Sequence, residues 1–367
     1  MMTATRRATE YTAGVDFGGT AIKLGLVADD GEVVADTTIP TLGHSSPDAL
    51  VELLAQTIRD LLRVTRPAAT GLRGVGIGVP GLVDVSRGIV HELVNVSRWK
   101  DVPLGRLLRE RLRCPCVVDN DVNVIALGEW SFGAGQGTWD SVYLTLGTGV
   151  GGGLVLNGML LRGVSGSAGE IGHTIIQPDG PKCACGARGC LEVFIGTAGI
   201  LRMAEDAVRR GKSSKLAKIA QEADGQLTPE LISRAAALGD VGAKDVWERV
   251  GRYLGLTVAS TINLLNPERV VIGGGIARAW RWFMPSLRRT VQEQAFKIPA
   301  KAVDIVPAAL GTRAGIVGGA VLAWEQDRRV GGRGSGADGR VRGALDTSRA
   351  ARGGGMASSP RAEGGRT

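Results

Sequence analysis

The chain has 367 residues, with 44 Lys or Arg, 36 Asp or Glu and a formal net charge of +8. This length fits about two domains and is ample for a buried core. No charge-free apolar stretch reaches the roughly 18 residues of a membrane span, and no apolar run follows the N-terminal Arg-Arg pair, so we expect a cytoplasmic protein without a membrane partner.

Residues 14–27, GVDFGGTAIKLGLV, place a glycine turn between two runs rich in β-forming residues and therefore predict a hairpin. Backbone N–H groups at such a turn can bind phosphate, and a threonine hydroxyl adds a donor. An acidic residue just before the turn could hold Mg²⁺ through water. The candidate nucleotide residues here are Asp16, Gly18, Gly19, Thr20 and Lys23. An ordinary tight hairpin is the competing interpretation.

Helices and strands alternate along the next hundred residues, which favours a sheet covered by helices. Cys114 and Cys116 flank a proline and are interpreted as packing residues. The predicted elements are a helix over residues 48–64 behind Ser46-Pro47, a strand over 74–79, a helix over 104–113, a strand over 116–119 and a helix over 121–132.

Asp121 opens the last of these helices, directly after Asn120. The positive end of the helix dipole would stabilise its charge. One interpretation makes Asp121 a helix N-cap, and an equally favoured one makes it the base that takes a proton from an acceptor hydroxyl. A carboxylate with a pKa well below 7 is a weak base, but phosphoryl transfer depends more on orientation than on early proton removal.

Residues 142–156, VYLTLGTGVGGGLVL, repeat the hairpin with a second glycine turn, Gly147-Thr148-Gly149. Two such hairpins about 130 residues apart indicate a duplicated α/β architecture with a cleft between the halves. A third glycine cluster, residues 273–275 with Gly274 at its centre, follows a predicted strand over 269–273. Without side chains it could pass under a flat base, so the three elements together predict a nucleotide held across the cleft.

His173, Cys183, Cys185 and Cys190 have the spacing H-x(9)-C-x-C-x(4)-C. One imidazole and three thiolates form a closed tetrahedral set that suits structural Zn²⁺, with buried free thiols as the alternative. Glu170 and Glu192 lie close to the two ends of this segment. Carboxylates accept hydrogen bonds from sugar hydroxyls, so a metal that orders the loop would place both for sugar binding. Solvated surface carboxylates are the alternative.

The second half is mainly helical, and its last forty residues change character. Residues 328–367 hold 11 Gly, 9 Arg and 3 acidic residues, so 9 − 3 = +6 of the net charge lies there. Such a segment cannot bury enough surface to fold, and we predict a solvated, disordered tail over 327–367. An Arg/Gly tail can also bind RNA or anionic surfaces, and this is the alternative interpretation. Because no aromatic residues are interleaved with the arginines, nucleic-acid binding is not expected. The predicted helices and strands lie at residues 201–210, 229–239, 243–265, 284–294, 303–306 and 314–324.

The segments GVDFGGTAIK, VVDNDVN, LGTGVGGG, GEIGHT and CACGARGCLE together resemble the ROK family (repressors, open reading frames and kinases), particularly its bacterial glucokinase branch. The resemblance runs from about residue 14 to about residue 323. It implies a two-lobed actin-like ATPase fold, ribonuclease H-like in each lobe, with an interdomain cleft. It also implies transfer of the ATP γ-phosphate to the 6-hydroxyl of a hexose, and a homodimer.

On this resemblance Asp121 is the catalytic base, and His173 is both a zinc ligand and a sugar donor. The implied sugar contacts are Gly81, Asn95, Asn120, Asp121, Glu170, His173 and Glu192. The implied contacts to ATP and Mg²⁺ are Asp16, Gly18, Gly19, Thr20, Gly147, Thr148, Gly149 and Gly274. The implied zinc ligands are His173, Cys183, Cys185 and Cys190.

The sequence predicts an extension over residues 1–12, a small lobe over 13–119 plus 310–326, and a large lobe over 120–309 that carries the zinc loop, 170–192. The leading hypothesis is a kinase that converts glucose to glucose 6-phosphate. The alternatives are an N-acetylglucosamine or N-acetylmannosamine kinase and a non-catalytic sugar sensor. A repressor would need an added helix-turn-helix module, for which the residues before the first hairpin leave no room. The sequence does not decide whether polyphosphate can replace ATP.

Overall fold

The computed structural model describes residues 10–44, 46–65, 71–93, 96 and 99–331. Two five-stranded sheets and a three-stranded one organise these residues. The first sheet has the order β3-β2-β1-β4-β8, with β1 (Tyr11–Phe17), β2 (Ala21–Val27), β3 (Val33–Pro40), β4 (Leu72–Val79) and β8 (Cys116–Asn120). The small sheet contains β5 (Val83–Asp84), β6 (Ile89–Glu92) and β7 (Lys100–Val102).

The second large sheet has the order β11-β10-β9-β12-β13 and repeats the plan of the first. In both sheets a hairpin pairs with a parallel strand from later in the chain, β1 with β4 and β9 with β12. The two glycine-turn hairpins predicted from the sequence are thus confirmed. The strands are β9 (Ser141–Leu146), β10 (Val150–Leu156), β11 (Met159–Leu160), β12 (Arg269–Gly273) and β13 (Asp304–Pro307).

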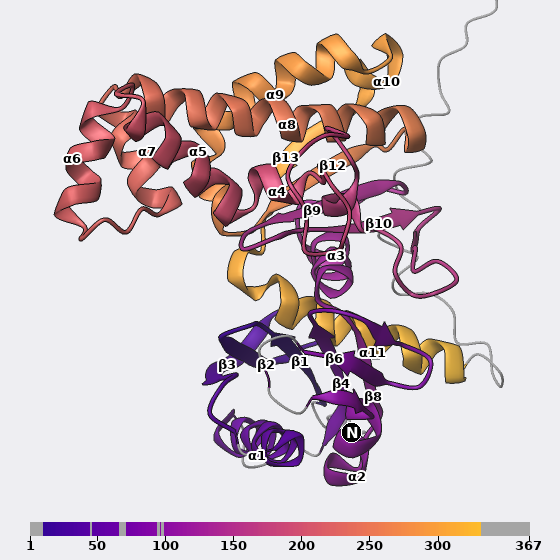
Figure 1. Ribbon diagram of the computed structural model, residues 1–367. Coiled ribbons are helices and arrows are strands. Elements are labelled where there is room, and N and C mark those ends of the chain that lie inside the picture. Colours follow the sequence, from indigo (N-terminus) through magenta and orange to yellow (C-terminus); the bar gives the residue numbers. More distant parts are fainter. Residues whose placement is uncertain (1–9, 45, 66–70, 94–95, 97–98, 332–367) are drawn as a thin grey trace, which may run out of the picture.

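Helices cover the sheets and form a large helical layer above the second one (Figure 1). The α-helices are α1 (Pro47–Thr65), α2 (Leu104–Leu112), α3 (Asp121–Phe132), α4 (Glu192–Ile195), α5 (Thr197–Arg209), α6 (Ser214–Glu222), α7 (Pro229–Ala237), α8 (Val241–Leu265), α9 (Trp280–Gln294), α10 (Lys297–Ala302) and α11 (Ala314–Gly331). Short 3₁₀ turns are η1 (Ile171–His173), η2 (Gly275–Ala279) and η3 (Gly311–Arg313).

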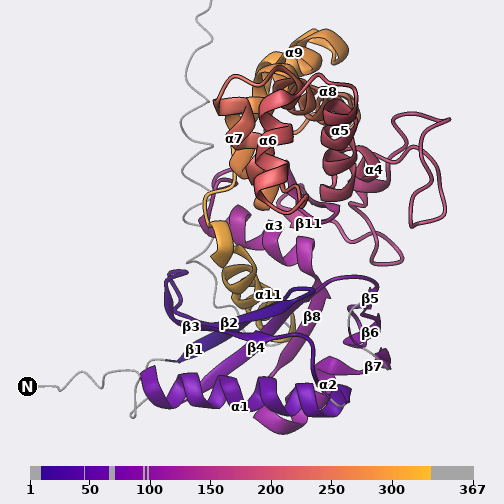
Figure 2. The ribbon, with the colours of Figure 1, turned by 60° about the vertical axis from the view of Figure 1, so that its left-hand side comes forward.

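The first sheet is covered by α1 and α2 on one face and by α11 on the other (Figure 2). Glycine allows α11 to approach the strands closely. A Cβ on Gly14 of β1 would lie 1.7 Å from the carbonyl oxygen of Ile316, and one on Gly76 of β4 would lie 1.8 Å from that of Gly319. Side chains at these positions would therefore push the helix away from the sheet.

On the opposite side α11 packs against α3, again through glycine. A Cβ on Gly318 would lie 1.7 Å from the carbonyl oxygen of Val124, so the two helices touch backbone to backbone. The chain passes between the two large sheets twice. It runs from β8 directly into α3 at Asn120–Asp121, and it returns from β13 through η3 into α11. The α3–α11 pair therefore lies where the sheets are joined.

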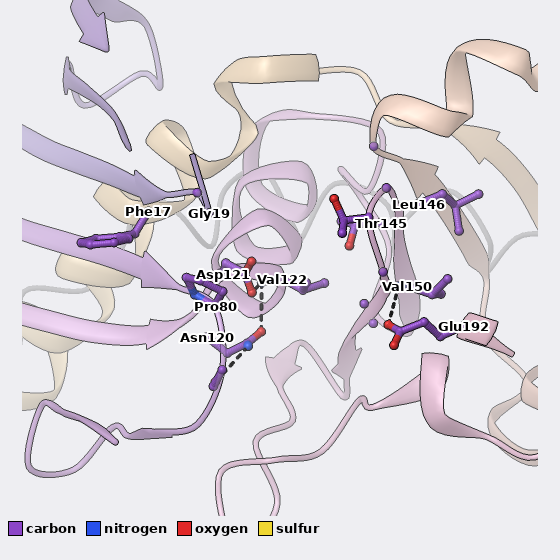
Figure 3. A pocket seen from close by; sticks show the side chains of 18 of the residues that line it. Phe17, Gly19, Pro80, Asn120, Asp121, Val122, Thr145, Leu146, Val150 and Glu192 are labelled. Carbon is purple, nitrogen blue, oxygen red and sulfur yellow. Dashed lines mark hydrogen bonds between the residues drawn. The ribbon is translucent and has the colours of Figure 1, made fainter. Parts of the chain in front are cut away.

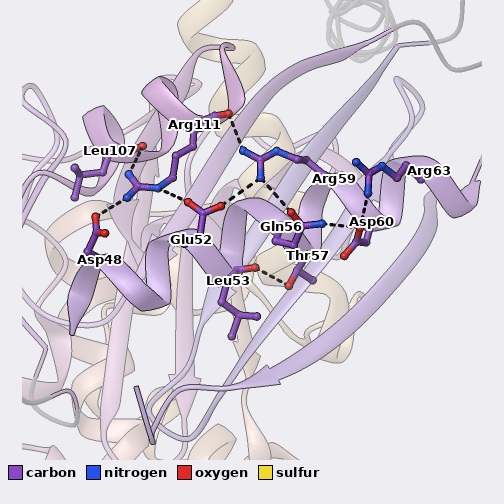
Figure 4. A network of polar contacts seen from close by, with 10 residues as sticks. All are labelled: Asp48, Glu52, Leu53, Gln56, Thr57, Arg59, Asp60, Arg63, Leu107 and Arg111. Atoms are coloured by element: carbon purple, nitrogen blue, oxygen red, sulfur yellow. Dashed lines mark hydrogen bonds and ion pairs between the residues drawn. The ribbon is translucent and has the colours of Figure 1, made fainter. Parts of the chain in front are cut away.

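A polar network holds α2 against α1 on the outer face (Figure 4). The Arg111 guanidinium of α2 donates to Asp48 at 2.5 Å and to Glu52 at 2.9 Å, both on α1. Arg59 of α1 returns a hydrogen bond to the carbonyl oxygen of Arg111 at 3.0 Å. Because the two carboxylates are exposed, these ion pairs fix orientation more than they add stability. Most of the stability of the α1–α2 contact comes from burial of the apolar faces of the two helices.

Most predicted elements are confirmed, and several boundaries change. Strand β1 begins at Tyr11, inside the predicted extension, and α11 continues to Gly331, so the start of the predicted tail is helical. The rest of the tail lies outside the described residues. Cys114 and Cys116 are buried in the core of the first sheet, as expected. No helix in the described ranges is long and apolar enough to cross a membrane.

Candidate active site

A cavity with a volume of about 700 Å³ lies between the two glycine turns (Figure 3). Its wall combines residues from both large sheets, from the start of α3 and from the segment that follows β11. The predicted site residues that line it are Gly18, Gly19, Gly81, Asn120, Asp121, Gly147, Thr148, Gly149, Glu170, His173, Glu192 and Gly274. The fold therefore brings into one space groups that lie as far apart in sequence as residues 18 and 274.

Asp121 is the first residue of α3, and Asn120 rather than Asp121 is the N-cap. The Asn120 side-chain oxygen accepts hydrogen bonds from the N–H of Val122 at 2.9 Å and of Asn123 at 3.3 Å. The Asp121 carboxylate also accepts from the Val122 N–H, at 2.9 Å. Because the capping role is filled by Asn120, the capping interpretation of Asp121 is wrong, and its carboxylate is available to the cavity.

The electrostatics around Asp121 differ from the expectation. Burial is the largest influence and raises its pKa to about 6, with the negative charge of Asp16 as the next contribution and that of Glu170 a smaller one. Hydrogen bonds from the helix N-terminus lower the pKa but do not outweigh these effects. Asp121 is thus a stronger base than the sequence suggested, and it remains mostly ionised at neutral pH.

Glu192 joins the metal-loop side of the cavity to the second glycine turn. Its carboxylate accepts a hydrogen bond from the Val150 N–H at 3.0 Å, as Figure 3 shows. A Cβ on Gly149 would lie 2.4 Å from the same carboxylate oxygen, so a side chain there would displace the Glu192 carboxylate. The other end of the turn is fixed by Thr197, whose hydroxyl donates to the Gly147 carbonyl at 2.9 Å. This turn is therefore ordered before any ligand binds.

Four potential metal ligands converge beside the cavity. The ligand atoms of His173, Cys183, Cys185 and Cys190 all lie within 4.8 Å of one another. The Nδ1 atom of His173 is 3.6 Å from the Cys183 sulfur. Its Nε2 atom is 4.0 Å from the carboxylate of Glu170, which is exposed at the cavity. The two ring nitrogens therefore face two different groups, the thiol cluster and the Glu170 carboxylate at the cavity, as the expected dual role of His173 requires.

A second cavity of about 460 Å³ adjoins the first, and both are lined by Thr145, Gly274 and Gly275. Asp16 and Lys23 line this second cavity rather than the first. They are cross-strand neighbours in the β1–β2 hairpin, and the Lys23 ammonium is 3.5 Å from the Asp16 carboxylate. Burial raises the pKa of Asp16, although Lys23 partly opposes this.

The sequence analysis missed several residues of the second cavity, among them Arg278, Thr312 and Gly315. Gly315 is close-packed, because a Cβ there would lie 2.5 Å from Asp16. The segment around residue 312 contains no sequence motif that would have identified it as part of a binding site. Of the predicted residues, Thr20 lines neither cavity, and Asn95 lies outside the described residues.

Comparison with known proteins places the chain. The profile described as "ROK family" matches residues 12–326. The chain belongs to the ROK family. A glucokinase from Halalkalibacterium halodurans is 38% identical over 87% of the chain and 97% of its own length. A xylose repressor from Bacillus subtilis is 30% identical over 84% of the chain and 75% of its own length. The relatives of this chain thus include both kinases and repressors.

Solved ROK structures have the same architecture. A ROK hexokinase from Thermus thermophilus superposes with a TM-score of 0.72 at 31% identity, covering 87% of this chain and 99% of its own. A ROK glucokinase from Streptomyces griseus, solved in complex with glucose and AMPPNP, gives a TM-score of 0.70 at 32% identity, covering 86% and 99%. The chain therefore has the α/β fold of the actin-like ATPases, as the resemblance implied.

Proposed function

We propose that this ROK protein is an ATP-dependent hexose kinase and that its substrate is glucose, which it converts to glucose 6-phosphate. The observation that carries the proposal is the composition of the larger cavity. Asp121 lies there with the sugar-side groups Glu170, His173 and Glu192, and with both glycine turns. A base, hydroxyl acceptors and phosphate-binding backbone within one space are the parts that phosphoryl transfer to a sugar requires.

In the proposed reaction the sugar 6-hydroxyl lies against Asp121. Its oxygen forms a bond to the γ-phosphorus while the bond from that phosphorus to the bridging oxygen of ADP breaks. The hydroxyl proton passes to the Asp121 carboxylate. The N–H groups at Gly18–Gly19 and Gly147–Gly149 bind the phosphates and stabilise the charge that moves between them. The products are the sugar phosphate and ADP.

The residues present fit both metals of the proposal. The three thiols and one imidazole are the ligand set of a structural Zn²⁺, which would order the segment between Glu170 and Glu192. Asp16, which precedes the first glycine turn and lines the second cavity, would hold Mg²⁺ through water, and this cation neutralises phosphate charge when bound. Lys23, its ion-pair partner, adds a positive charge on the same side.

A coupled assay with ATP, Mg²⁺ and a panel of glucose, mannose, N-acetylglucosamine and N-acetylmannosamine tests the proposal. We expect turnover with glucose to exceed that with each amino sugar by at least about tenfold, because a pocket fitted to hydroxyl groups excludes a larger substituent. A higher kcat/KM for an amino sugar would instead identify that kinase. Glucose binding without turnover of any sugar would identify a sensor.

Asp121→Ala tests the role of the base. We expect kcat to fall by about 10² to 10⁴. Glucose binding, measured by calorimetry, should stay measurable because the other sugar-side groups remain. Asp245→Ala, at an exposed aspartate of α8 that lines neither cavity, serves as the control and should keep full activity. Undiminished turnover in Asp121→Ala would refute the assignment of Asp121.

A further inference from the structure

We propose that Glu129 is a positioning residue for the nucleotide, holding the segment 308–312 as one wall of the second cavity. The inference rests on the proposed function, because it takes that cavity as part of the nucleotide site. Glu129 lies in the last turn of α3 and is only 1% exposed. An isolated buried carboxylate is strongly unfavourable, so its partners are decisive.

The carboxylate of Glu129 is satisfied by backbone N–H groups. One oxygen accepts from Leu310 at 2.8 Å, and the other accepts from Ala309 at 3.0 Å and from Ala134 at 2.8 Å. Gly133 leaves room for this, because a Cβ there would lie 2.2 Å from the carboxylate. Two consecutive N–H groups of the segment 308–312 are therefore bound to a single side chain.

The contacts to Glu129 lie where the segment 308–312 leaves the sheet and enters the wall of the second cavity. Ala308 is bonded to β12, its N–H donating to the Ile272 carbonyl at 3.0 Å, but the chain leaves the sheet after it. The next two N–H groups point at Glu129, and Gly311 and Thr312, which follow, line the second cavity. Glu129 therefore fixes the backbone position of Ala309 and Leu310, directly before the residues that line the second cavity.

The position of Glu129 on α3 gives the contact a second consequence. The helix starts with Asp121 in the larger cavity, and its last turn carries Glu129, which itself lines the smaller one. Both passages of the chain between the large sheets, at Asn120–Asp121 and at 308–313, are thus attached to one helix. A shift of the segment 308–312 would change the place of the nucleotide relative to Asp121.

The test compares Glu129→Gln with a matched control, Asp240→Asn. Asp240 is also a buried carboxylate that accepts from three backbone N–H groups, those of Ala243, Lys215 and Leu216, but it lines neither cavity. The amide in either variant turns one acceptor into a donor that faces an N–H group. A purely structural effect would therefore appear in both proteins as a lower melting temperature.

The readouts are the dissociation constants of ADP and of glucose from calorimetry, with KM for ATP from the coupled assay. For Glu129→Gln we expect the dissociation constant of ADP and the KM for ATP to rise by about tenfold, while the dissociation constant of glucose changes by less than about twofold. Asp240→Asn should change neither constant. ADP binding within twofold of wild type in Glu129→Gln, or equal losses for ADP and glucose, would overturn the proposal.

If Glu129→Gln does not fold, Glu129→Asp replaces it, since the charge is kept and the reach is shortened by one methylene. We expect the same selective loss of ADP binding, and unchanged ADP binding would again overturn the proposal. Wild-type turnover is a separate measurement. A wild-type protein that binds ADP without phosphorylating any hexose would refute the kinase proposal, while the comparison of ADP constants would still decide the role of Glu129.

Discussion

The carboxylate of Glu192, at the start of α4, accepts a hydrogen bond from the backbone N–H of Val150 at 3.0 Å. This contact joins the end of the cysteine segment to the second glycine turn, so one side chain would serve both the proposed sugar side and the proposed phosphate side of the cavity. Glu192→Gln and Glu192→Ala separate the charge of this side chain from its hydrogen bond. The amide oxygen of glutamine can still accept from the Val150 N–H but carries no charge, whereas alanine removes both.

We predict that Glu192→Gln raises KM for glucose and leaves KM for ATP within about twofold, because the turn keeps its hydrogen bond. Glu192→Ala should raise both constants, because it removes the acceptor of the Val150 N–H. Steady-state kinetics with each substrate varied in turn provides the measurement. Equal effects of the two variants on KM for ATP would show that the hydrogen bond does not order the turn.

The pKa of Asp121 predicts how activity depends on pH. A base with a pKa of about 6 must be ionised, so kcat/KM for glucose should fall as the pH drops through about 6. Removing the negative charge of Asp16 favours the ionised form of Asp121. Asp16→Asn should therefore move this acidic limb to lower pH, besides reducing the rate. A limb that stays in place or moves upward would contradict this account.

The proposed zinc site, His173, Cys183, Cys185 and Cys190, predicts a link between metal content and sugar affinity. Metal analysis should find about one Zn per chain. Cys185→Ser should lower the metal content and raise KM for glucose by at least about tenfold, since the loop that carries Glu170 loses its order. The control is Cys114→Ser, at a buried cysteine that is not part of the cluster. Full sugar affinity in a zinc-free Cys185→Ser would refute this link.

Gly315→Ala should weaken nucleotide binding although it adds only a methyl group. The new Cβ would lie 2.5 Å from Asp16, whose carboxylate must then move from its place in the second cavity. We expect KM for ATP to rise by about tenfold or more, with KM for glucose little changed. Gly71→Ala, where a Cβ meets nothing within 4 Å, is the control and should behave as wild type.

The sequence predicted the repeated hairpins and the start of α3 because local pattern dictates both. Glycine turns between β-branched runs give β1–β2 and β9–β10, and the acidic residue after Asn120 coincides with the first turn of α3. The metal ligands could be found because their spacing is itself the signal. By contrast β3 and the strands β5, β6 and β7 were missed, although each pairs with a strand close by in the chain. Strand β3 has only half-buried and exposed residues, and β5, β6 and β7 are too short, at 2, 4 and 3 residues, to show an alternating pattern.

Long-range electrostatics and close packing were also beyond the sequence. The raised pKa of Asp121, on α3, depends on burial and on the charge of Asp16, which lies on β1. The ion pair of Asp16 with Lys23 follows from the hairpin register. The contact of Gly315 with Asp16 joins residues 299 positions apart, since 315 − 16 = 299, and no local pattern announces it.

Because α11 packs closely on the first sheet, the folding of that sheet during synthesis depends on a helix near the end of the described chain. Strands β1, β2, β3, β4 and β8 leave the ribosome first, yet the helix that covers one of their faces begins only at Ala314. The second large sheet, complete at Pro307, can form before it. The half of the protein that is translated first must therefore wait, with an apolar sheet face uncovered, until nearly the whole chain has emerged. During that interval the nascent chain offers chaperones a binding surface.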